Sequence, residues 1–230
     1  MRGWGIAAGA IIVLWWVMAV FVIPVSATGT AQQTSTPSPI VFFQDDFATY
    51  SHRWMESKSP KASAVYGSGV LDLRVESPGV GVWSLPDFDV ALPEFQMKAA
   101  VTVNGGSTDS VAGFVMGYQD TASRGVSFYE VGATPQGEWR LFFYDDGDWD
   151  DLTPEADVTP DPATEADTIT LRVAVSGDEF RVWIDDRLAG EIRCPLAESG
   201  FGVFARAGRG YVDVSFDDVM VTELIEGDES

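Results

Sequence analysis

Few side chains of this sequence have the types and spacing that catalysis requires. His52 is the only histidine and lies in the string Tyr50–Trp54. A serine hydrolase triad would also need a serine nucleophile and a carboxylate, and no Gly-x-Ser-x-Gly turn is present to expose such a serine. We therefore expect His52 and Arg53 to be exposed, and Trp54 to pack on the domain near Phe47.

Acidic side chains near both ends of the sequence have the chemistry of a calcium site. Asp45 and Asp46 precede Phe47, and Asp217 lies in the string Phe216-Asp217-Asp218-Val219. Calcium takes several carboxylate and carbonyl oxygens, so Asp45, Asp46 and Asp217 are candidate ligands of a structural ion if the first and last strands meet. Alternatively, these carboxylates cap turns and close the sheet edge through hydrogen bonds. No motif requires a cofactor.

A second acidic run extends over Asp145–Asp151. Counted from Asp146, its aspartates alternate as in the calcium-binding loop of an EF-hand. Asp151 nevertheless stands where such a loop needs glycine, and Asp157 where it needs the bidentate glutamate. We predict a solvated hairpin tip here.

Aromatic and arginine side chains give the best-supported binding chemistry, which is that of carbohydrate. Sugar sites place aromatic faces against the apolar side of a pyranose and use nearby polar groups for its hydroxyls. Strand alternation puts Arg181 and Trp183 on one face, with Arg172 on the matching face of the neighbouring strand. In a two-sheet domain, however, any of these aromatics can instead pack against a loop or under an edge. The candidate ligand-binding residues are Tyr118, Tyr129, Arg140, Tyr144, Trp149, Arg172, Arg181 and Trp183.

An apolar period of two dominates the sequence after Ile40, which predicts half-buried antiparallel strands. Leu71, Leu73 and Val75, for example, alternate with polar residues. The turn residues Ser176-Gly177-Asp178 separate two alternating segments and predict a hairpin. No segment after residue 40 shows a sustained 3.6-residue period, so we expect an all-β domain. The predicted strands are 40–43, 71–75, 80–85, 95–103, 111–118, 126–131, 139–144, 169–175, 180–184, 188–192, 201–205 and 212–221.

The N-terminal part of the sequence has the pattern of an export segment. Arg2 precedes an uncharged apolar run over residues 3–23, and Val25-Ser26-Ala27 offers small residues for signal-peptidase cleavage. The run is longer than a usual signal core and close to the length that spans a bilayer, so it is either a signal peptide or a signal anchor. The domain is then extracytoplasmic, secreted or anchored to the cytoplasmic membrane by residues 3–23. The expected organisation is an export segment at 1–27, a flexible polar linker at 28–39, the folded domain at 40–224 and an acidic tail at 225–230.

The net charge limits the expected binding partners, and the cysteine content limits how the fold can be stabilised. The formal net charge is -21, from 35 Asp and Glu against 14 Lys and Arg. Such a charge repels nucleic acid, and it leaves the N-terminal segment as the expected membrane contact. Cys194 is the only cysteine, so no disulfide forms within the chain, and its apolar surroundings predict a buried, inert thiol.

The order of several short motifs resembles that of the concanavalin A-like lectin/glucanase jelly rolls. This superfamily includes laminin G-like domains and domains related to glycoside hydrolase family 16. The resemblance covers about residues 40–224 and implies a two-sheet antiparallel jelly-roll sandwich. With the apolar run described above, we expect this sandwich to be preceded by one N-terminal hydrophobic export helix. The motifs that bracket the domain predict that its first and last strands lie side by side. The motifs are Asp45-Asp46-Phe47 with Trp54, Gly113–Asp120, Gly137–Leu141, Asp185-Asp186 where an Asn-Gly turn is usual, and Phe216–Val219.

This resemblance implies carbohydrate binding or carbohydrate hydrolysis. Family 16 enzymes supply their acid pair from a Glu-x-Asp-x-x-Glu strand. The nearest string, Glu165–Thr170, has threonine in place of the second glutamate, so the motif is absent. We therefore expect an exported noncatalytic binding or adhesion module at a bacterial cell surface, with a polysaccharide or glycan as its ligand. Two alternatives stay open: a glycoside hydrolase-like enzyme with a different acid pair, and a purely structural envelope domain.

Overall fold

The computed structural model describes residues 38–50, 53–88, 94–123, 125–154, 168–196 and 200–224. These residues belong to the unit Ser38–Ser230. Among them, no helix is long and apolar enough to cross a membrane. The predictions that fall outside these ranges, and stay predictions, concern the export segment 1–27, most of the linker 28–39, His52, Glu165–Asp167 and the acidic tail 225–230.

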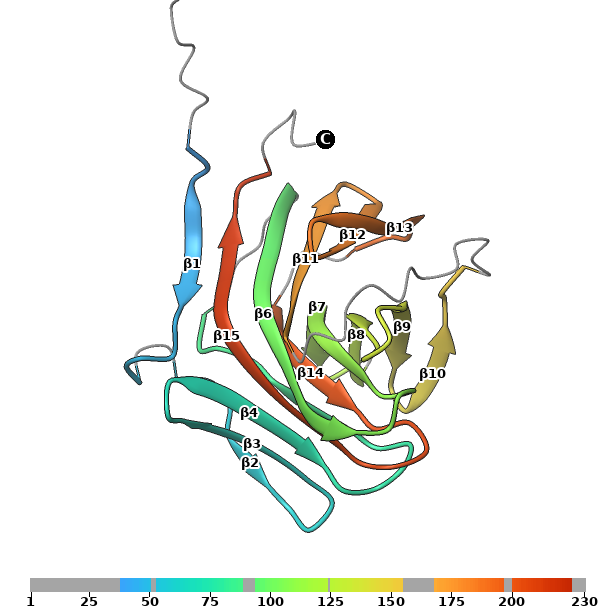
Figure 1. The fold of residues 1–230 in the computed structure, drawn as a ribbon. Coiled ribbons are helices and arrows are strands. Elements are labelled where there is room, and N and C mark those ends of the chain that lie inside the picture. The colour runs from blue at the N-terminus through green and yellow to red at the C-terminus, as the bar shows by residue number, and fades with distance from the viewer. Residues whose placement is uncertain are drawn as a thin grey trace, which may run out of the picture. The chain divides into compact units, whose positions relative to one another are not determined.

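The described residues form two antiparallel sheets, as the sequence predicted (Figure 1). The strands are β1 (Val41–Asp45), β2 (Ser57–Lys58), β3 (Ala62–Gly67), β4 (Val70–Val75), β5 (Gly81–Ser84), β6 (Glu94–Gly106), β7 (Val111–Thr121), β8 (Gly125–Ala133), β9 (Trp139–Asp145), β10 (Asp148–Asp151), β11 (Thr168–Ser176), β12 (Glu179–Ile184), β13 (Arg187–Arg193), β14 (Gly200–Arg206) and β15 (Val212–Thr222). Sheet A has the order β13-β12-β11-β6-β15-β4-β3-β2, with β1 also paired to β15. Sheet B has the order β10-β9-β8-β7-β14-β5.

The first and last strands lie side by side, which confirms the prediction from the bracketing motifs. β1 pairs antiparallel with β15, from Val41 opposite Thr222 to Asp45 opposite Val219. Trp54 packs beside Phe47 as expected, with their ring centroids 5.5 Å apart. The pairing covers one strand edge with another and removes backbone groups that would otherwise stay unpaired.

Two tight turns fix the register of the three strands at one edge of sheet A. The predicted hairpin joins β11 to β12, and Gly177 supplies a positive φ of 60°. Between β12 and β13, Asp185 and Asp186 adopt φ values of 50° and 60°, the left-handed pair that favours Asn-Gly in such turns. The Asp185 carboxylate accepts a hydrogen bond of 2.8 Å from the Thr170 backbone amide, which supports this conformation.

The sequence pattern missed β2, β3 and β10. β2 consists of two exposed residues, and β3 contains small residues and glycine with only one buried position. β10 has the sequence Asp-Trp-Asp-Asp, and aspartate disfavours strands. Pairing with β9, which places Trp149 opposite Tyr144, makes it a strand. The predicted solvated tip corresponds to the turn at Asp146 and Gly147 and to the four exposed residues after it.

The inner faces of the two sheets enclose the main apolar core. Fully buried members include Leu71, Met97 and Phe216 from sheet A and Phe114 and Val131 from sheet B. Cys194 lies in this core, as predicted, and burial raises the pKa of its thiol to about 12. The thiolate is the reactive form of cysteine, so this thiol is chemically quiet.

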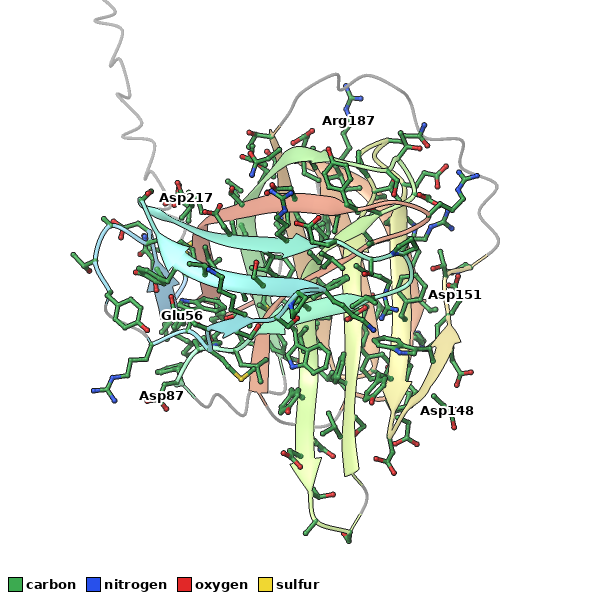
Figure 2. All side chains as sticks on the ribbon, turned by 90° about the horizontal axis from the view of Figure 1, so that it is seen from below. Glu56, Asp87, Asp148, Asp151, Arg187 and Asp217 are labelled. Atoms are coloured by element: carbon green, nitrogen blue, oxygen red, sulfur yellow. The ribbon has the colours of Figure 1, made fainter. Side chains whose placement is uncertain are left out.

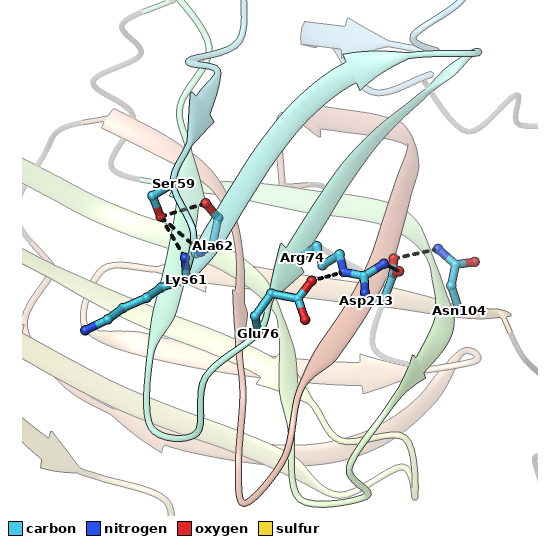
Figure 3. Close-up of polar contacts among 7 residues, drawn as sticks. All are labelled: Ser59, Lys61, Ala62, Arg74, Glu76, Asn104 and Asp213. Carbon is cyan, nitrogen blue, oxygen red and sulfur yellow. Dashed lines mark hydrogen bonds and ion pairs between the residues drawn. The ribbon is translucent and has the colours of Figure 1, made fainter.

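Polar side chains on the outer face of sheet A bond to one another from strand to strand. Arg74 on β4 forms ion pairs with Glu76 at 2.6 Å and with Asp213 on β15 at 3.2 Å (Figure 3). Asn104 on β6 donates to Asp213 and to Ser215. We call this outer surface of sheet A face A. The polar side chains of face A thus form ion pairs and hydrogen bonds with one another, although water can reach them.

Candidate functional site

The outer face of sheet B points away from the main core and carries a second apolar cluster. We call this surface face B. Val111, Val115, Phe128 and Phe204 are buried there, on four positions that alternate with core residues of the same strands. Partly buried side chains surround them, namely Trp83, Leu85, Tyr118, Val126, Phe142 and Tyr144.

Phe128 lies at the centre of the aromatic side chains of face B. It has no exposed surface, whereas Trp149 at the rim is 37% exposed. The Tyr144 and Trp149 rings pack on each other with centroids 4.7 Å apart. A buried ring surrounded by partly exposed rings forms a rigid apolar surface on which a flat ligand can stack. The centroid distances from Phe128 are 5.2 Å to Trp83, 5.8 Å to Tyr118, 4.9 Å to Tyr144 and 5.8 Å to Trp149.

A buried ion pair lies next to these rings. Glu130 lies two residues after Phe128 on β8 and therefore points to the same face. Its Oε2 accepts hydrogen bonds from Arg206 on β14, at 2.9 Å from Nε and 2.6 Å from Nη2. The Glu130 side chain has no exposed surface and that of Arg206 is 16% exposed. Among the described residues, nothing donates a hydrogen bond to the buried Glu130 Oε1.

Contacts across several strands show that sheet B curves toward face B. β5 and β8 are separated by β14 and β7. In a flat sheet this separation would be about 14 Å, at roughly 4.8 Å per strand. A methyl group built on Gly81 of β5 would nevertheless lie only 3.9 Å from Glu130 Oε1 on β8. The curvature brings side chains from distant strands together and allows Arg206 to reach Glu130.

Burial is the main influence on the pKa of the Glu130 carboxyl. Removal from water raises the pKa of this carboxyl to about 7, although the neighbouring Arg206 guanidinium favours the charged form and offsets part of the rise. Glu130 therefore changes its charge near neutral pH, in the middle of an apolar surface. A carboxyl group in such surroundings is a common feature of functional sites, although structural ion pairs also produce it.

Two aromatic rings cover the Arg206 guanidinium. Its Cζ lies 3.6 Å from the centroid of the Trp149 ring and 5.1 Å from that of Phe142. Such stacking orients a guanidinium while leaving its edge available for hydrogen bonds.

Asp148 and Asp151 project from β10 at this edge of the sheet (Figure 2). Face B thus combines aromatic rings, one buried ion pair and an acidic rim.

The structure divides the predicted ligand-binding residues among three surroundings. Tyr118, Arg140, Tyr144 and Trp149 come together on face B. Tyr129 instead lies in the main core, where its hydroxyl donates to the Pro195 carbonyl at 2.8 Å. The remaining three predicted residues lie on face A, where Arg172 stacks on Trp183 at 3.9 Å and Arg181 pairs with Glu179 at 2.6 Å. Our candidate site therefore contains only the first group.

The three predicted calcium ligands make hydrogen bonds within the protein. The carboxylate of Asp45 accepts from the Phe47 amide at 2.8 Å and from the Trp54 indole at 2.9 Å. Asp46 accepts from the Ala48 amide, and Asp217 from the amide of Asp218. In the described part of the chain, no group of three or more His, Cys, Asp or Glu side chains is arranged to hold a metal ion. These bonds match the capping alternative, and calcium binding stays a prediction that melting curves with calcium and with EDTA can test.

Sequence reasoning missed Glu130 and Arg206, as well as Trp83, Phe128 and Phe142. One signal was available for the ion pair, because each charged residue interrupts an apolar strand, as in Phe128-Tyr129-Glu130-Val131. A charge at such a position is rarely buried without a partner. The identity of the partner was not available, since 76 residues separate Glu130 from Arg206.

Comparisons with known proteins identify the fold of this chain. No family model matches the sequence, and no curated protein matches it. Among solved structures, the carbohydrate-binding module CBM66 from Bacillus subtilis is similar with a TM-score of 0.52 at 13% identity, covering 74% of this chain and 95% of that one. A GlcNAcα1-4Gal-releasing endo-β-galactosidase from Clostridium perfringens gives 0.55 at 11% identity, covering 84% of this chain and 64% of the enzyme. A Bacillus subtilis protein of unknown function with a galectin-like fold gives 0.53 at 5% identity, covering 80% and 96%.

These likenesses show a jelly-roll sandwich fold, as the sequence motifs led us to expect. At such low identities they concern the fold alone, because one fold of this kind carries many unrelated functions.

Proposed function

We propose that this domain is a noncatalytic carbohydrate-binding module whose ligand lies on face B. The observation that carries the proposal is the cluster of partly exposed rings around Phe128, built on a curved sheet beside the Glu130–Arg206 pair. Folding requires apolar side chains on the inner face of each sheet, and does not require a second aromatic cluster on an outer face. Pyranose rings stack on such surfaces through their C–H groups.

The polar groups of face B suit the hydroxyls of a sugar. Arg206 directs Nε and Nη2 to Glu130, and its side chain remains 16% exposed, so we infer that the guanidinium can also reach a ligand. The Tyr118 and Tyr144 rings are partly buried on the same face. A few polar groups among aromatic rings are the usual composition of a small-molecule site, because the rings supply affinity and the polar groups supply orientation.

A glycoside hydrolase would use this face differently. It would need two carboxyl groups about 5 to 10 Å apart, both able to reach the sugar. Glu130 has the raised pKa of a general acid, but it has no exposed surface and its Oε2 is bonded to the Arg206 guanidinium. Binding without hydrolysis is therefore the function that this arrangement supports best.

We also propose that the module is exported and acts at a bacterial cell surface. The support is the sequence, in which Arg2 and the apolar run 3–23 precede a small-residue cleavage segment. The domain would then be secreted or held at the membrane, where polysaccharides are abundant.

The test of glycan binding is a polysaccharide pull-down combined with a glycan array. We expect the wild-type domain to bind at least one glycan, and a Tyr144→Ala/Trp149→Ala variant to lose that binding while it stays folded, as a cooperative melting transition would show. Tyr211→Ala is the matched control, because Tyr211 is an aromatic residue with 46% exposure that lies outside face B. Equal loss in the control, or no binding of any glycan by the wild type, would refute the proposal.

A further inference from the structure

Among the described residues, the arginines of face B are balanced by acidic partners. Arg206 is paired with Glu130, and Arg140 is paired with Glu138 at 2.6 Å. Asp120 of β7, opposite Val126, and Asp151 of β10, opposite Phe142, have no matching arginine on this surface in the described part of the chain.

In the described part of face B the other titratable side chains are the phenols of Tyr118 from β7 and Tyr144 from β9, which carry neither a carboxylate nor a guanidinium. The described strand β5 adds no ionisable side chain, since its sequence is Gly-Val-Trp-Ser. The summed charge of the surface is therefore negative. It becomes more positive by one unit when Glu130 loses its charge.

This charge balance separates two classes of sugar. A neutral pyranose can stack on the rings and accept a hydrogen bond from Arg206 without electrostatic cost. A uronate or another carboxylated sugar would approach two aspartates that no arginine of the described surface balances, and a guanidinium whose charge is already neutralised. Its carboxylate would lose water without gaining a full counter-charge, which costs free energy.

We propose that face B binds uncharged sugars and excludes carboxylated ones, and that Glu130 sets this selectivity by neutralising Arg206. The inference rests on the glycan binding proposed above. Glu130 is a positioning residue in this scheme, because it has no exposed surface and acts through Arg206. Replacement of its carboxylate by an amide of the same shape would leave the Arg206 charge available to an anionic ligand.

Lowering the pH should remove the charge of Glu130 as the substitution does. Burial raises the pKa of Glu130 to about 7, so the carboxyl is charged at pH 8 and protonated at pH 5.5. Uronate carboxylates keep their charge at pH 5.5, since a carboxylic acid in water titrates near pH 4. The wild-type domain should therefore tolerate carboxylated sugars better at pH 5.5 than at pH 8.

The experiment compares neutral glycans with their own carboxylated forms. Laminarin, β-1,4-galactan and cello-oligosaccharides are tested by titration calorimetry, and each one that binds is tested again after oxidation of its C6 hydroxymethyl group to carboxylate. Wild type, Glu130→Gln and Glu191→Gln are measured at pH 8. Glu191→Gln is the matched control, because it makes the same change of net charge beside Arg181 on face A.

We expect the wild type to bind the carboxylated form at least about tenfold more weakly than the neutral form, and Glu130→Gln to reduce this ratio by about tenfold. The affinity for the carboxylated form that Glu130→Gln gains should fall at high salt, and Glu191→Gln should behave like the wild type. If Glu130→Gln does not fold, the ratio measured for the wild type at pH 5.5 and pH 8 gives the same test.

Failures of the two proposals differ. If the wild type binds no glycan, the proposed function itself is refuted. A wild type that binds neutral and carboxylated forms equally, or a ratio that neither Glu130→Gln nor pH changes, overturns the charge selectivity and leaves glycan binding intact.

Discussion

The two outer faces of this sandwich satisfy their side chains in different ways. On face A, polar groups bond to one another from strand to strand, as Arg74 does with Glu76 and Asp213. On face B, rings pack around a buried Phe128 and enclose the Glu130–Arg206 pair. Both faces border water, and polar side chains such as those of face A suffice there. The fold alone therefore does not require the aromatic cluster of face B. The second arrangement costs solubility, and it supports our proposal that a ligand uses this surface.

Arginine side chains show the same contrast. Arg74 on face A is 50% exposed, and its ion pairs are screened by water. Arg206 on face B is 16% exposed and stacks on Trp149 at 3.6 Å. Burial and stacking fix the position of a guanidinium, which is a condition for recognising a ligand.

The largest expected effect concerns the packing of face B. Phe128→Ala should lower the free energy of unfolding by about 3 to 5 kcal/mol, because the substitution leaves a cavity among four aromatic rings. Urea unfolding monitored by tryptophan fluorescence measures the change. Phe128→Leu, which keeps most of the volume, should cost clearly less. A change below about 1 kcal/mol in Phe128→Ala would mean that face B is not a packed cluster.

A second prediction compares affinities. Trp149→Ala should weaken binding of the glycan identified by the array about 30-fold, which corresponds to the loss of about 2 kcal/mol from an exposed aromatic contact. Arg181→Ala on face A should leave the dissociation constant unchanged. Calorimetric titration of both variants distinguishes the two faces. A larger loss in Arg181→Ala would move the site to face A.

The third prediction concerns pH and stability. In the folded protein the pKa of Glu130 is raised from 4.5 to about 7, so the folded state holds this proton more tightly than the unfolded state. Its contribution to stability is therefore complete below about pH 4.5 and is lost as the pH rises to about 7. The difference in unfolding free energy between wild type and Glu130→Gln should fall across this window and stay constant above it. A pH-independent difference would mean that burial does not control this carboxyl.

The smallest expected effect lies on face A. Arg74→Ala should leave the melting temperature within experimental error, because the ion pairs of Arg74 are exposed to water. Differential scanning calorimetry at low and high salt checks this expectation. A clear loss of stability would show that the polar network of face A acts cooperatively, and would weaken the contrast between the two faces.

The strands could be predicted from the sequence because alternation is a local signal. Leu71, Leu73 and Val75 reveal a strand and its buried face without reference to any other segment. Alternation does not say which sheet a strand joins. For that reason the sequence pattern groups Tyr144 and Trp149 with Trp183, which lies on the other sheet.

The site was harder to predict than the strands. Tyr129 and Glu130 are adjacent on β8, and only the assignment of the inner and outer faces tells which of the two side chains reaches the core. The Glu130–Arg206 pair also depends on strand order and on the curvature of sheet B. Both are properties of the assembled sandwich, so no local pattern contains them.

The pairing of β1 with β15 has a mechanical consequence. The chain enters the domain at Val41 beside Thr222, where the last strand ends, and both strands belong to sheet A. A tether at either end therefore pulls on the sheet opposite to face B. Tension along β1 is shared by several hydrogen bonds to β15 at once, a geometry that resists extension better than opening the bonds one by one. Face B, where we propose that a glycan binds, therefore lies on the sheet that carries neither of these attachment points.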